Sequence, residues 1–379
     1  MDAPINRRFF LASTTQAAAA AALIPNLIDV RDHNATGDGK TDDTAAIQAA
    51  LDKAADTKAT VYIPEGVFSC STLKMRPRVG LVGNPTWTYG TNAGSVLRLR
   101  DESAKCLLDV TDALGARVIG LCLEGGRLGD GVHGVMADKP DYSRHDDLFI
   151  ERCRIDGFTG DGIHLACAWV FTIRHCMVSY NRGNGLWYRG WDGWVLDNWI
   201  SGNGEAGIGA YEENASCTFT ANRIEWNRKG GIILHGGQNY NFTGNYFDRS
   251  GGPGITLLRR NKTPCQSIAI TGNFIWRSGA QLGKAITDEH QSAHIRFEGV
   301  RGVAFVGNVM QVSRDDNGRG MFSPNYAMVL KDCDQTVIAN NTLFGGALKE
   351  LIVDLGEHGA GFILKDNPGT LFVELPPAK

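Results

Sequence analysis

Apolar and polar positions along this chain follow a pattern that recurs about every two dozen residues. An Asn stands between two apolar residues, one three positions before it and one two positions after it. The Asn residues are Asn198, Asn222, Asn245, Asn273 and Asn308, separated by 24, 23, 28 and 35 residues. A self-similar pattern of this period is typical of solenoid proteins, in which each repeat forms one layer of a stack.

The apolar partners of these Asn residues keep the same offsets. They are Val195, Phe219, Phe242, Ile270 and Phe305 on one side and Ile200, Ile224, Phe247, Ile275 and Met310 on the other. The pattern extends back to Cys153 and Cys176 and forward to Asn341. Stacked repeats would place the Asn side chains in a polar column at a chain bend. The apolar residues on both sides of the bend would then face a shared interior.

A second recurring element begins at a Gly and predicts a strand. Examples are Gly162-Ile163-His164-Leu165, Gly185-Leu186-Trp187-Tyr188 and Gly231-Ile232-Ile233-Leu234. Together with two strands beside the Asn bend, each repeat contains three short strands. This predicts an all-β fold class, a parallel β-helix whose rungs rise about 4.8 Å each. Helical repeats are less favoured because apolar residues alternate with a period of two and Gly, Asn and Thr are frequent.

The N-terminal region predicts a helix that caps the solenoid. The polar stretch Asn34-Ala35-Thr36-Gly37-Asp38-Gly39 leads to residues Thr41 to Thr44, which supply the N-cap candidates. The apolar residues that follow share one helical face; they are Ile47, Ala50, Leu51 and Ala54. We therefore expect a short α-helix at about residues 42–55, which would cover the unpaired strand edges at one end of the stack.

This N-terminal motif, with Val61-Tyr62-Ile63-Pro64-Glu65-Gly66 after it, resembles the N-terminus of the pectate-lyase-like superfamily. That superfamily includes polygalacturonase-type hydrolases, polysaccharide lyases and phage tailspikes. The resemblance extends in general pattern over residues 29–369 and implies a single-stranded right-handed parallel β-helix. It does not extend to the polygalacturonase motifs. Gly131-Val132-His133-Gly134 and His294-Ile295-Arg296 are the nearest matches to their Gly-His-Gly and Arg-Ile-Lys.

The first residues of the chain predict export. Arg7 and Arg8, followed by Phe9-Phe10-Leu11 and an Ala-rich run, resemble a twin-arginine signal. We expect residues 1–25 to be this signal peptide and residues 26–379 to be the β-helix domain. The expected location is therefore the periplasm or the medium.

Composition narrows the partners and cofactors. The net charge of −3 gives no electrostatic reason to expect nucleic acid. No apolar run reaches the roughly 18 residues of a membrane span. The 9 Cys residues show no CxxC pair and no metal-ligand spacing. We therefore expect reduced, buried thiols, no metal site and no cofactor, and the oligomeric state is left open.

Parity along the strand that begins at the Gly separates inward apolar residues from outward ones. The outward set is His164, Trp187, Arg189, Trp191, Tyr211, Glu213, His235, Thr256, Arg260, His294, Arg296 and Glu298. Stacking should align Arg189, Tyr211 and His235 in one column. The resemblance implies that this strand carries the substrate cleft.

The outward set is consistent with a groove for a sugar polymer. The expected substrate-binding residues are His164, Trp187, Trp191, Arg260, Arg296 and Glu298. Trp rings stack on the apolar faces of sugars, and Arg pairs with the carboxylates of a uronic-acid polymer. The alternative is an ordinary solvated sheet face.

Two reactions remain open at this stage. In β-elimination a base removes the proton α to the uronate carboxylate, while a cation stabilises the resulting charge. Tyr211 or His235 is the expected base or acid, Arg189 the charge partner and Glu213 the orienting group. We favour this cleavage of an acidic polysaccharide slightly over hydrolysis.

A hydrolase, or a fructan-type glycosyl transferase, would instead use two carboxylates that flank the bond. Asp161 and Asp192 are the alternative acids, although an Asp-Gly step such as Asp161-Gly162 is also typical of a turn. A non-catalytic glycan-binding β-helix is the second alternative.

Overall fold

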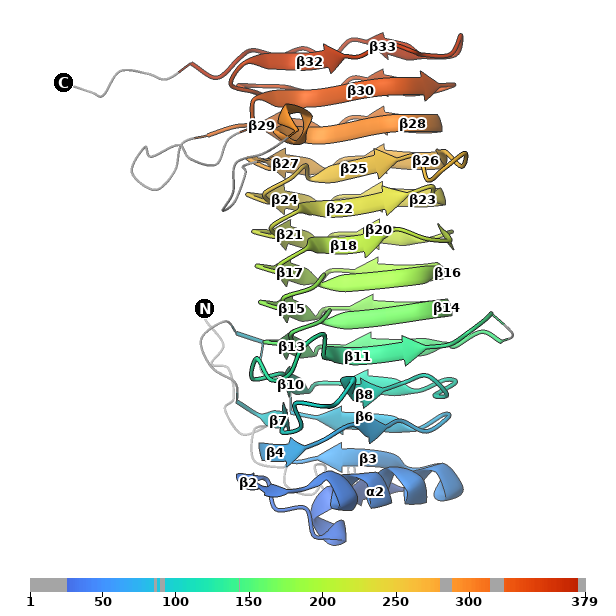
Figure 1. Cartoon of the computed structure of the whole chain (residues 1–379), viewed down its shortest axis with the longest axis vertical. Helices are drawn as coiled ribbons and strands as arrows, with labels where there is room; N and C mark the ends of the chain where they lie inside the picture. The colour runs from blue at the N-terminus through green and yellow to red at the C-terminus, as the bar shows by residue number, and fades with distance from the viewer. Residues whose placement is uncertain are drawn as a thin grey trace, which may run out of the picture.

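The computed structural model describes residues 26–84, 87–88, 93–142, 144–279, 288–313 and 324–373. The chain winds into a right-handed parallel β-helix that stands as one long stack of rungs (Figure 1). The fold class predicted from the repeat is therefore confirmed. The expected signal peptide, residues 1–25, lies outside the described residues. Within the described ranges, no helix has the length and apolarity needed to cross a bilayer.

Two parallel sheets form the walls of the stack, one of 22 strands and one of 11. The smaller sheet contains β2 (Asp38–Asp42), β4 (Gly66–Cys70), β7 (Ser95–Leu99), β10 (Cys122–Glu124), β13 (Arg154–Asp156), β15 (Met177–Ser179), β17 (Trp199–Ser201), β21 (Arg223–Glu225), β24 (Tyr246–Asp248), β27 (Phe274–Trp276) and β29 (Val309–Gln311). The strands β17, β21, β24, β27 and β29 of this sheet each begin directly after an Asn of the predicted column.

The larger sheet bends through a corner, so that its strands supply two walls. It contains β1 (Leu27–Asp29), β3 (Thr60–Ile63), β5 (Leu73–Lys74), β6 (Gly80–Gly83), β8 (Cys106–Asp109), β9 (Arg117–Ile119), β11 (His133–Asp138), β12 (Leu148–Glu151), β14 (Ile163–Arg174), β16 (Leu186–Leu196), β18 (Ala206–Ala210), β19 (Asn214–Ala215), β20 (Thr218–Thr220), β22 (Gly230–His235), β23 (Gln238–Thr243), β25 (Ile255–Leu258), β26 (Cys265–Thr271), β28 (Ala293–Val306), β30 (Tyr326–Asp334), β31 (Val337–Ala339), β32 (Glu350–Asp354) and β33 (Ile363–Lys365). We call the wall formed by β11, β18, β22, β25 and the first halves of β14, β16 and β28 the first face.

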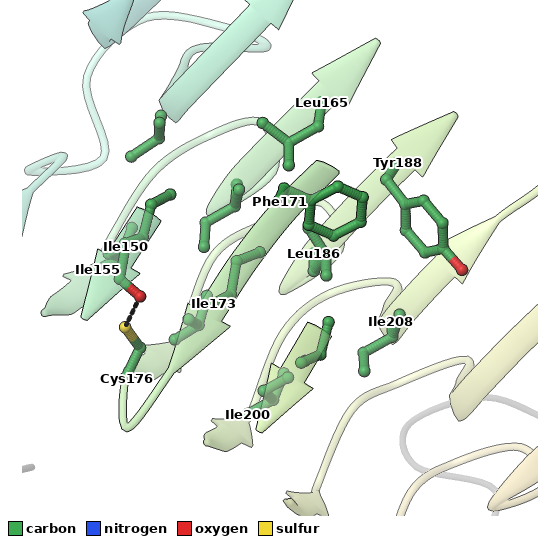
Figure 2. Close-up of a cluster of buried hydrophobic side chains, with 14 of the residues drawn as sticks. Ile150, Ile155, Leu165, Phe171, Ile173, Cys176, Leu186, Tyr188, Ile200 and Ile208 are labelled. Carbon is green, nitrogen blue, oxygen red and sulfur yellow. Dashed lines mark hydrogen bonds between the residues drawn. The ribbon is translucent and has the colours of Figure 1, made fainter. Parts of the chain in front are cut away.

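The strand register confirms the vertical alignment of the repeats. Ile163 pairs with Leu186, Leu186 with Ile208, and Ile208 with Ile232. All four side chains are buried. Figure 2 shows the neighbouring interior positions, including Leu165, Phe171, Tyr188 and Ile200, packed between the walls. This apolar interior supplies the main stabilisation of the fold.

The predicted Asn column is a hydrogen-bonded ladder. Asn222 Oδ1 accepts from the backbone N–H and from Nδ2 of Asn198, both at 3.0 Å. Asn222 in turn donates to Asn245 Oδ1 and, through Nδ2, to the carbonyl of Val195 at 2.8 Å. The ladder extends from Cys176, whose backbone N–H donates to Asn198, to Asn367, one rung beyond the predicted end.

A second, shorter Asn ladder was not predicted. Asn181 donates to Asn203 Oδ1, and Asn203 donates to Asn227 Oδ1, through both the backbone N–H and Nδ2. All three residues are buried. They satisfy backbone groups at a corner where the chain leaves the smaller sheet, as Asn does at tight bends.

The capping helix is confirmed as α2 (Thr44–Thr57), which lies across the N-terminal end of the stack (Figure 1). Its buried residues are the predicted Ile47, Ala50, Leu51 and Ala54. Short 3-10 helices occur at η2 (Val30–His33) and η3 (Glu289–Gln291). All nine Cys residues are free and buried, which confirms their predicted role as small core residues.

Two residues predicted to face outward are buried, Thr256 and His294. His294 precedes Ile295, which pairs with Ile255, so it occupies the corner position that Gly254 fills one rung earlier. For His294 the parity rule failed because side chains at this corner point inward. A Cβ at the equivalent Gly254 would lie against the buried side chain of Ile275. Burial lowers the pKa of His294 to about 3.

This buried imidazole should make stability depend on pH. Between about pH 6.5 and pH 3 the unfolded chain binds a proton at His294 that the folded chain does not, so stability falls as pH falls. The loss attributable to this group is about 2 kcal/mol between pH 7.5 and pH 5. Urea unfolding of the His294→Ala variant should no longer show this pH dependence. Alanine is accommodated at this corner, because Ala327 occupies the same position one rung on.

The exposed His145 provides the control for this measurement. His145→Ala should keep the pH dependence of the unmodified chain. If the unfolding free energy of His294→Ala depended on pH as that of the unmodified chain does, the assignment would be wrong. The cavity left by the substitution lowers this free energy at every pH and so does not affect the comparison.

Candidate active site

The outer side of the first face brings two His residues together. His133 begins β11, and His164 is the second residue of β14. Their ring centroids lie 4.3 Å apart. Strand pairing places Trp187 directly beside His164, and its ring stacks on the imidazole at 4.2 Å with an interplanar angle of 9°. The three rings form a continuous stack along the face.

A pocket of about 520 Å³ opens beside this stack. It is lined by Glu102, Ser103, Ala104, Lys105, Asp130, Gly131, His133, Met136, Asp138 and His164. Besides the two His residues, the lining contains Lys105, three carboxylates and four small or uncharged residues. A polar ligand in this pocket would meet imidazole groups held on a rigid sheet.

Asp161 links the two His residues from beneath the surface. Its Oδ2 lies 2.8 Å from His164 Nδ1, and its Oδ1 accepts from the backbone N–H and Nδ2 of Asn184 at 2.6 and 2.9 Å. Burial alone would raise the pKa of Asp161. Hydrogen bonds from His164 and Asn184, together with the nearby His133, outweigh burial and lower the pKa. Asp161 is therefore an ionised carboxylate.

These hydrogen bonds fix the tautomer of each imidazole. His133 Nδ1 accepts from the backbone N–H of Asp161 at 2.9 Å, so the ring proton is on Nε2. His164 Nδ1 must donate to the Asp161 carboxylate, so its Nε2 carries a lone pair. Burial and the adjacent His164 lower the pKa of His133 to about 4, which keeps it neutral at neutral pH. His164 Nε2, a proton acceptor, and His133 Nε2–H, a proton donor, are thus on neighbouring rings.

The same three residues can be tested as a metal site, since their ligand atoms lie within 4.8 Å of one another. His164 has the arrangement of a metal-ligating His, with Nδ1–H bound to a carboxylate. His133 does not, because its Nδ1 is occupied by a backbone N–H and its Nε2 is protonated. Asp161 keeps spare lone pairs on its oxygens, so His133 is the member of the group that does not fit a metal ion. The group is therefore better suited to acid–base chemistry than to holding a cation.

Of the predicted catalytic residues, Tyr211 reaches this group through Asn184, and His235 lies beside Tyr211. Tyr211 donates its hydroxyl to Asn184 Oδ1 at 2.9 Å, and its ring meets the edge of His235 at 5.1 Å. Burial lowers the pKa of His235 and raises that of Tyr211. Their predicted proximity is therefore present in the structure.

The head group of Arg189 points elsewhere. It bonds Glu212 at 3.0 Å and Cys167 Sγ at 2.9 Å, beyond the end of the first face. Glu213 lies 3.4 Å from Arg260. Strand pairing aligns Trp187 with Gly209 and Ala210 with Leu234, next to the predicted column, but the side chain of Tyr211 turns back toward Asn184.

The residues expected to bind substrate are largely occupied by partners within the protein. Arg260 pairs with Glu213, and Arg296 pairs with Asp288 and with Glu298 at 3.0 Å. Tyr142 covers one face of Trp191 at 3.8 Å. Asp192 accepts from Trp169 Nε1 at 2.9 Å, which is a structural role. Of the two alternative acids, only Asp161 belongs to the His group.

Asn184 and the charged pocket residues are not identifiable as site residues in the sequence, and His133 repeats in register with His164 there without a catalytic role assigned to it. One signal for His133 was present, because Gly131-Val132-His133 and Gly162-Ile163-His164 share a Gly-x-His pattern. No comparable signal marked Asn184, whose contacts join residues 23 and 27 positions apart.

A relative with detectable sequence similarity is mannuronan C5-epimerase AlgE6 of Azotobacter vinelandii. The two sequences are 30% identical over 198 residues, which is 48% of this chain and 21% of that protein. The chain therefore matches about a fifth of the length of this relative.

Solved structures share the fold at lower identity. The A-module of AlgE6 has a TM-score of 0.61 at 20% identity and is covered over 100% of its length by 92% of this chain. Tailspike protein 2 of the Escherichia coli O157:H7 bacteriophage CAB120 has a TM-score of 0.63 at 15% identity, with 84% of this chain and 42% of that chain covered. The GH87 α-1,3-glucanase of Streptomyces thermodiastaticus has 0.60 at 15%, with 89% and 69% covered. These likenesses show the fold alone.

Two family models match the chain. One, described as rhamnogalacturonase A/epimerase, pectate lyase-like, matches residues 27–100 and supports the N-terminal resemblance. The other, described as right handed beta helix region, matches residues 141–301 and 212–371. Because this second match covers more than half of the chain, the protein belongs to the right-handed β-helix family.

Proposed function

We propose that this protein is a carbohydrate-active enzyme that cleaves an acidic polysaccharide by β-elimination. The observation that carries the proposal is the Asp161–His164 pair, whose free Nε2 lies at a pocket on the first face. Support comes from the relative named as a mannuronan epimerase and from the solved tailspike and glucanase with the same fold. Fold likeness by itself does not fix a reaction, so the chemistry is argued from the site.

In this proposal His164 is the base. Its Nε2 removes the C5 proton of a uronate residue, which is acidic because it is α to the carboxylate. Asp161 stabilises the imidazolium that forms, as a buried carboxylate does for a catalytic His. The electron pair then forms the C4–C5 double bond while the C4–O bond breaks. His133 Nε2–H can donate a hydrogen bond to the departing oxygen, and the proton that His164 has taken up then passes to that oxygen, which returns His164 to its neutral form.

Lys105 supplies the positive charge that the reaction needs. The intermediate places negative charge on the uronate carboxylate, which a fixed cation stabilises. Lys105 lines the same pocket and forms no ion pair with any residue in the described ranges. Arg189, by contrast, is paired with Glu212 and faces Cys167. Lys105 therefore replaces Arg189 as the proposed charge partner.

The geometry favours elimination over epimerisation. Epimerisation must remove a proton from one side of C5 and return one to the opposite side. His133 and His164 are stacked neighbours on one outer wall, so both approach a bound sugar from the same side. Elimination needs a base and an acid on only one side, which this arrangement provides.

Hydrolysis remains the second candidate because of the pocket lining. Glu102, Asp130 and Asp138 place three carboxylates around the same space, and a pair of carboxylates is what a glycosidase requires. Asp161 is not a member of such a pair, because both of its oxygens accept hydrogen bonds and its pKa is lowered.

The two reactions give different products from the same incubation. Polymannuronate, polyguluronate and polygalacturonate are incubated with the protein, and absorbance of unsaturated uronates and new reducing ends are followed together. The proposal expects both signals to rise in parallel on at least one polymer. Reducing ends without the absorbance would establish hydrolysis instead, and binding without product would support a non-catalytic glycan-binding role.

We also propose that residues 1–25 direct export of the folded domain by the twin-arginine route, which places the enzyme in the periplasm or the medium. The support is the Arg7-Arg8 pair and the Phe-Leu sequence after it. Replacing both Arg residues by Lys should retain the protein in the cytoplasm, and unchanged export would contradict the proposal.

A further inference from the structure

Hydrogen bonds to both the nitrogen and the oxygen of the Asn184 side-chain amide fix its orientation. Its Nδ2 and backbone N–H donate to Asp161 Oδ1, while its Oδ1 accepts from the backbone N–H of Ala206 at 3.2 Å and from the Tyr211 hydroxyl at 2.9 Å. The reversed amide would turn its oxygen toward the Asp161 carboxylate, which has no proton to donate. The Tyr211 hydroxyl therefore helps to keep the donor side of Asn184 facing Asp161.

Tyr211 reaches Asn184 only because Gly209 has no side chain. Strand pairing places Gly209 between Trp187 and Ile233 in the outer column of the first face. A Cβ at Gly209 would lie 2.5 Å from the Tyr211 hydroxyl oxygen and 2.7 Å from Asn184 Oδ1. Gly209 lies within β18 and does not have a positive φ, so the backbone does not require glycine there. The missing side chain makes room for the phenol.

We propose that Tyr211 and Gly209 are positioning residues, which act through Asn184 and Asp161 to keep His164 in the tautomer that has a free Nε2. This assignment rests on the proposed role of His164 as the base. It changes the role of Tyr211 from base or acid to support of the base. A hydroxyl that donates to a buried amide is not available to remove a proton from a sugar.

The tautomer of His164 is the property that this relay controls. A neutral imidazole carries its proton on whichever nitrogen has the better acceptor. When Asp161 accepts a hydrogen bond from His164 Nδ1, the ring proton stays on Nδ1. When Asp161 is displaced, the proton can move to Nε2, and Nε2 then has no lone pair with which to act as a base. The effect should therefore appear in the free protein, before any substrate is added.

The test is nitrogen-15 NMR of the His side chains in the unliganded protein at a pH where His164 is neutral. The unmodified chain should show His164 with Nδ1–H. Tyr211→Phe, which removes only the hydroxyl, and Gly209→Ala, which displaces it, should both show a mixture of tautomers. Ile233→Ala, in the same outer column one rung on, is the control and should leave the spectrum unchanged.

A double variant separates the relay from general damage to the face. In a Tyr211→Ala background the phenol is gone, so Gly209→Ala should change the tautomer less than it does in the unmodified chain, and the remaining change should come from its own contact with Asn184 Oδ1. Additive effects would mean that Gly209 acts independently of Tyr211 and would overturn the proposal. So would a wild-type His164 with its proton on Nε2, or an unaltered tautomer in Tyr211→Phe.

This experiment stands apart from the search for a substrate. If no polymer is cleaved but the tautomer responds as expected, the relay stands and the proposed function fails. If a polymer is cleaved, Tyr211→Phe should lower kcat by about tenfold to a hundredfold with little change in KM. Equal cleavage rates in Tyr211→Phe and the unmodified chain would remove Tyr211 from the reaction altogether.

Discussion

Replacing His164 by Ala should lower kcat of the proposed cleavage by about a thousandfold or more. The variant removes the only atom in the Asp161 group that has a free lone pair facing the pocket, Nε2. It should change folding little, because the side chain is partly exposed and stacks on Trp187 from outside the core. The measurement is the rate of formation of unsaturated ends at saturating polymer, together with a thermal melt.

Asp161→Asn is the companion variant. An amide at this position still accepts hydrogen bonds from Asn184, but its charge no longer stabilises an imidazolium at His164. Its amide nitrogen can also donate to His164 Nδ1, which moves the ring proton to Nε2. We expect a loss of about 10³ to 10⁴ in kcat. The exposed His145→Ala is the control, and full activity in His164→Ala would rule out this site.

Asn222→Ala in the long ladder should cost about 3–6 kcal/mol of unfolding free energy. The side chain accepts from the backbone N–H and Nδ2 of Asn198 and donates to Asn245 Oδ1 and the Val195 carbonyl. Removing it leaves several polar groups unpaired in a buried corner, and each such group costs about 1–3 kcal/mol. The measurement is chemical denaturation at fixed pH.

Asn241→Ala is the matched control for the ladder. Asn241 is exposed on β23, and its side chain only accepts from Thr243 Oγ1 at 2.7 Å. Its loss should cost less than about 1 kcal/mol. Equal costs for Asn222→Ala and Asn241→Ala would mean that the ladder contributes no more than surface polar groups do.

The stack could be predicted from the sequence because its period is written directly in the side chains. An Asn that recurs at spacings of 23 to 35 residues, with apolar residues at fixed offsets, is compatible with few structures other than a solenoid. The same periodicity predicts that the apolar residues after each Gly, such as Ile163 and Leu186, share one inward column, and both are buried.

Periodicity was less informative about where side chains point once they leave the strand. Tyr211 turns back toward Asn184 because Gly209 leaves space for it, and Arg189 turns the other way because Glu212 and Cys167 are its neighbours. Those directions depend on contacts between rungs. A parity rule assigns a residue to a face but does not assign its partner.

The same limit explains why Asp161 was weighed as a turn residue. In the sequence it precedes a Gly at the entrance to a strand, which is typical of turn chemistry. In the structure it is 7% exposed and joins His164 to Asn184. Only stacking of consecutive rungs shows that a turn residue in one coil is within hydrogen-bond distance of residues in the coils on either side.

The claim on which the account depends most is that His164 removes the proton from C5 of a uronate. The intact polymer is incubated with the protein in heavy water, and proton NMR of the products tests this claim directly. The account predicts that each cut made by the wild-type protein leaves a new non-reducing-end sugar that lacks its C5 proton, and that His164→Ala forms no such ends. New non-reducing ends that retain the C5 proton, or formation of unsaturated ends by His164→Ala at the wild-type rate, would contradict it.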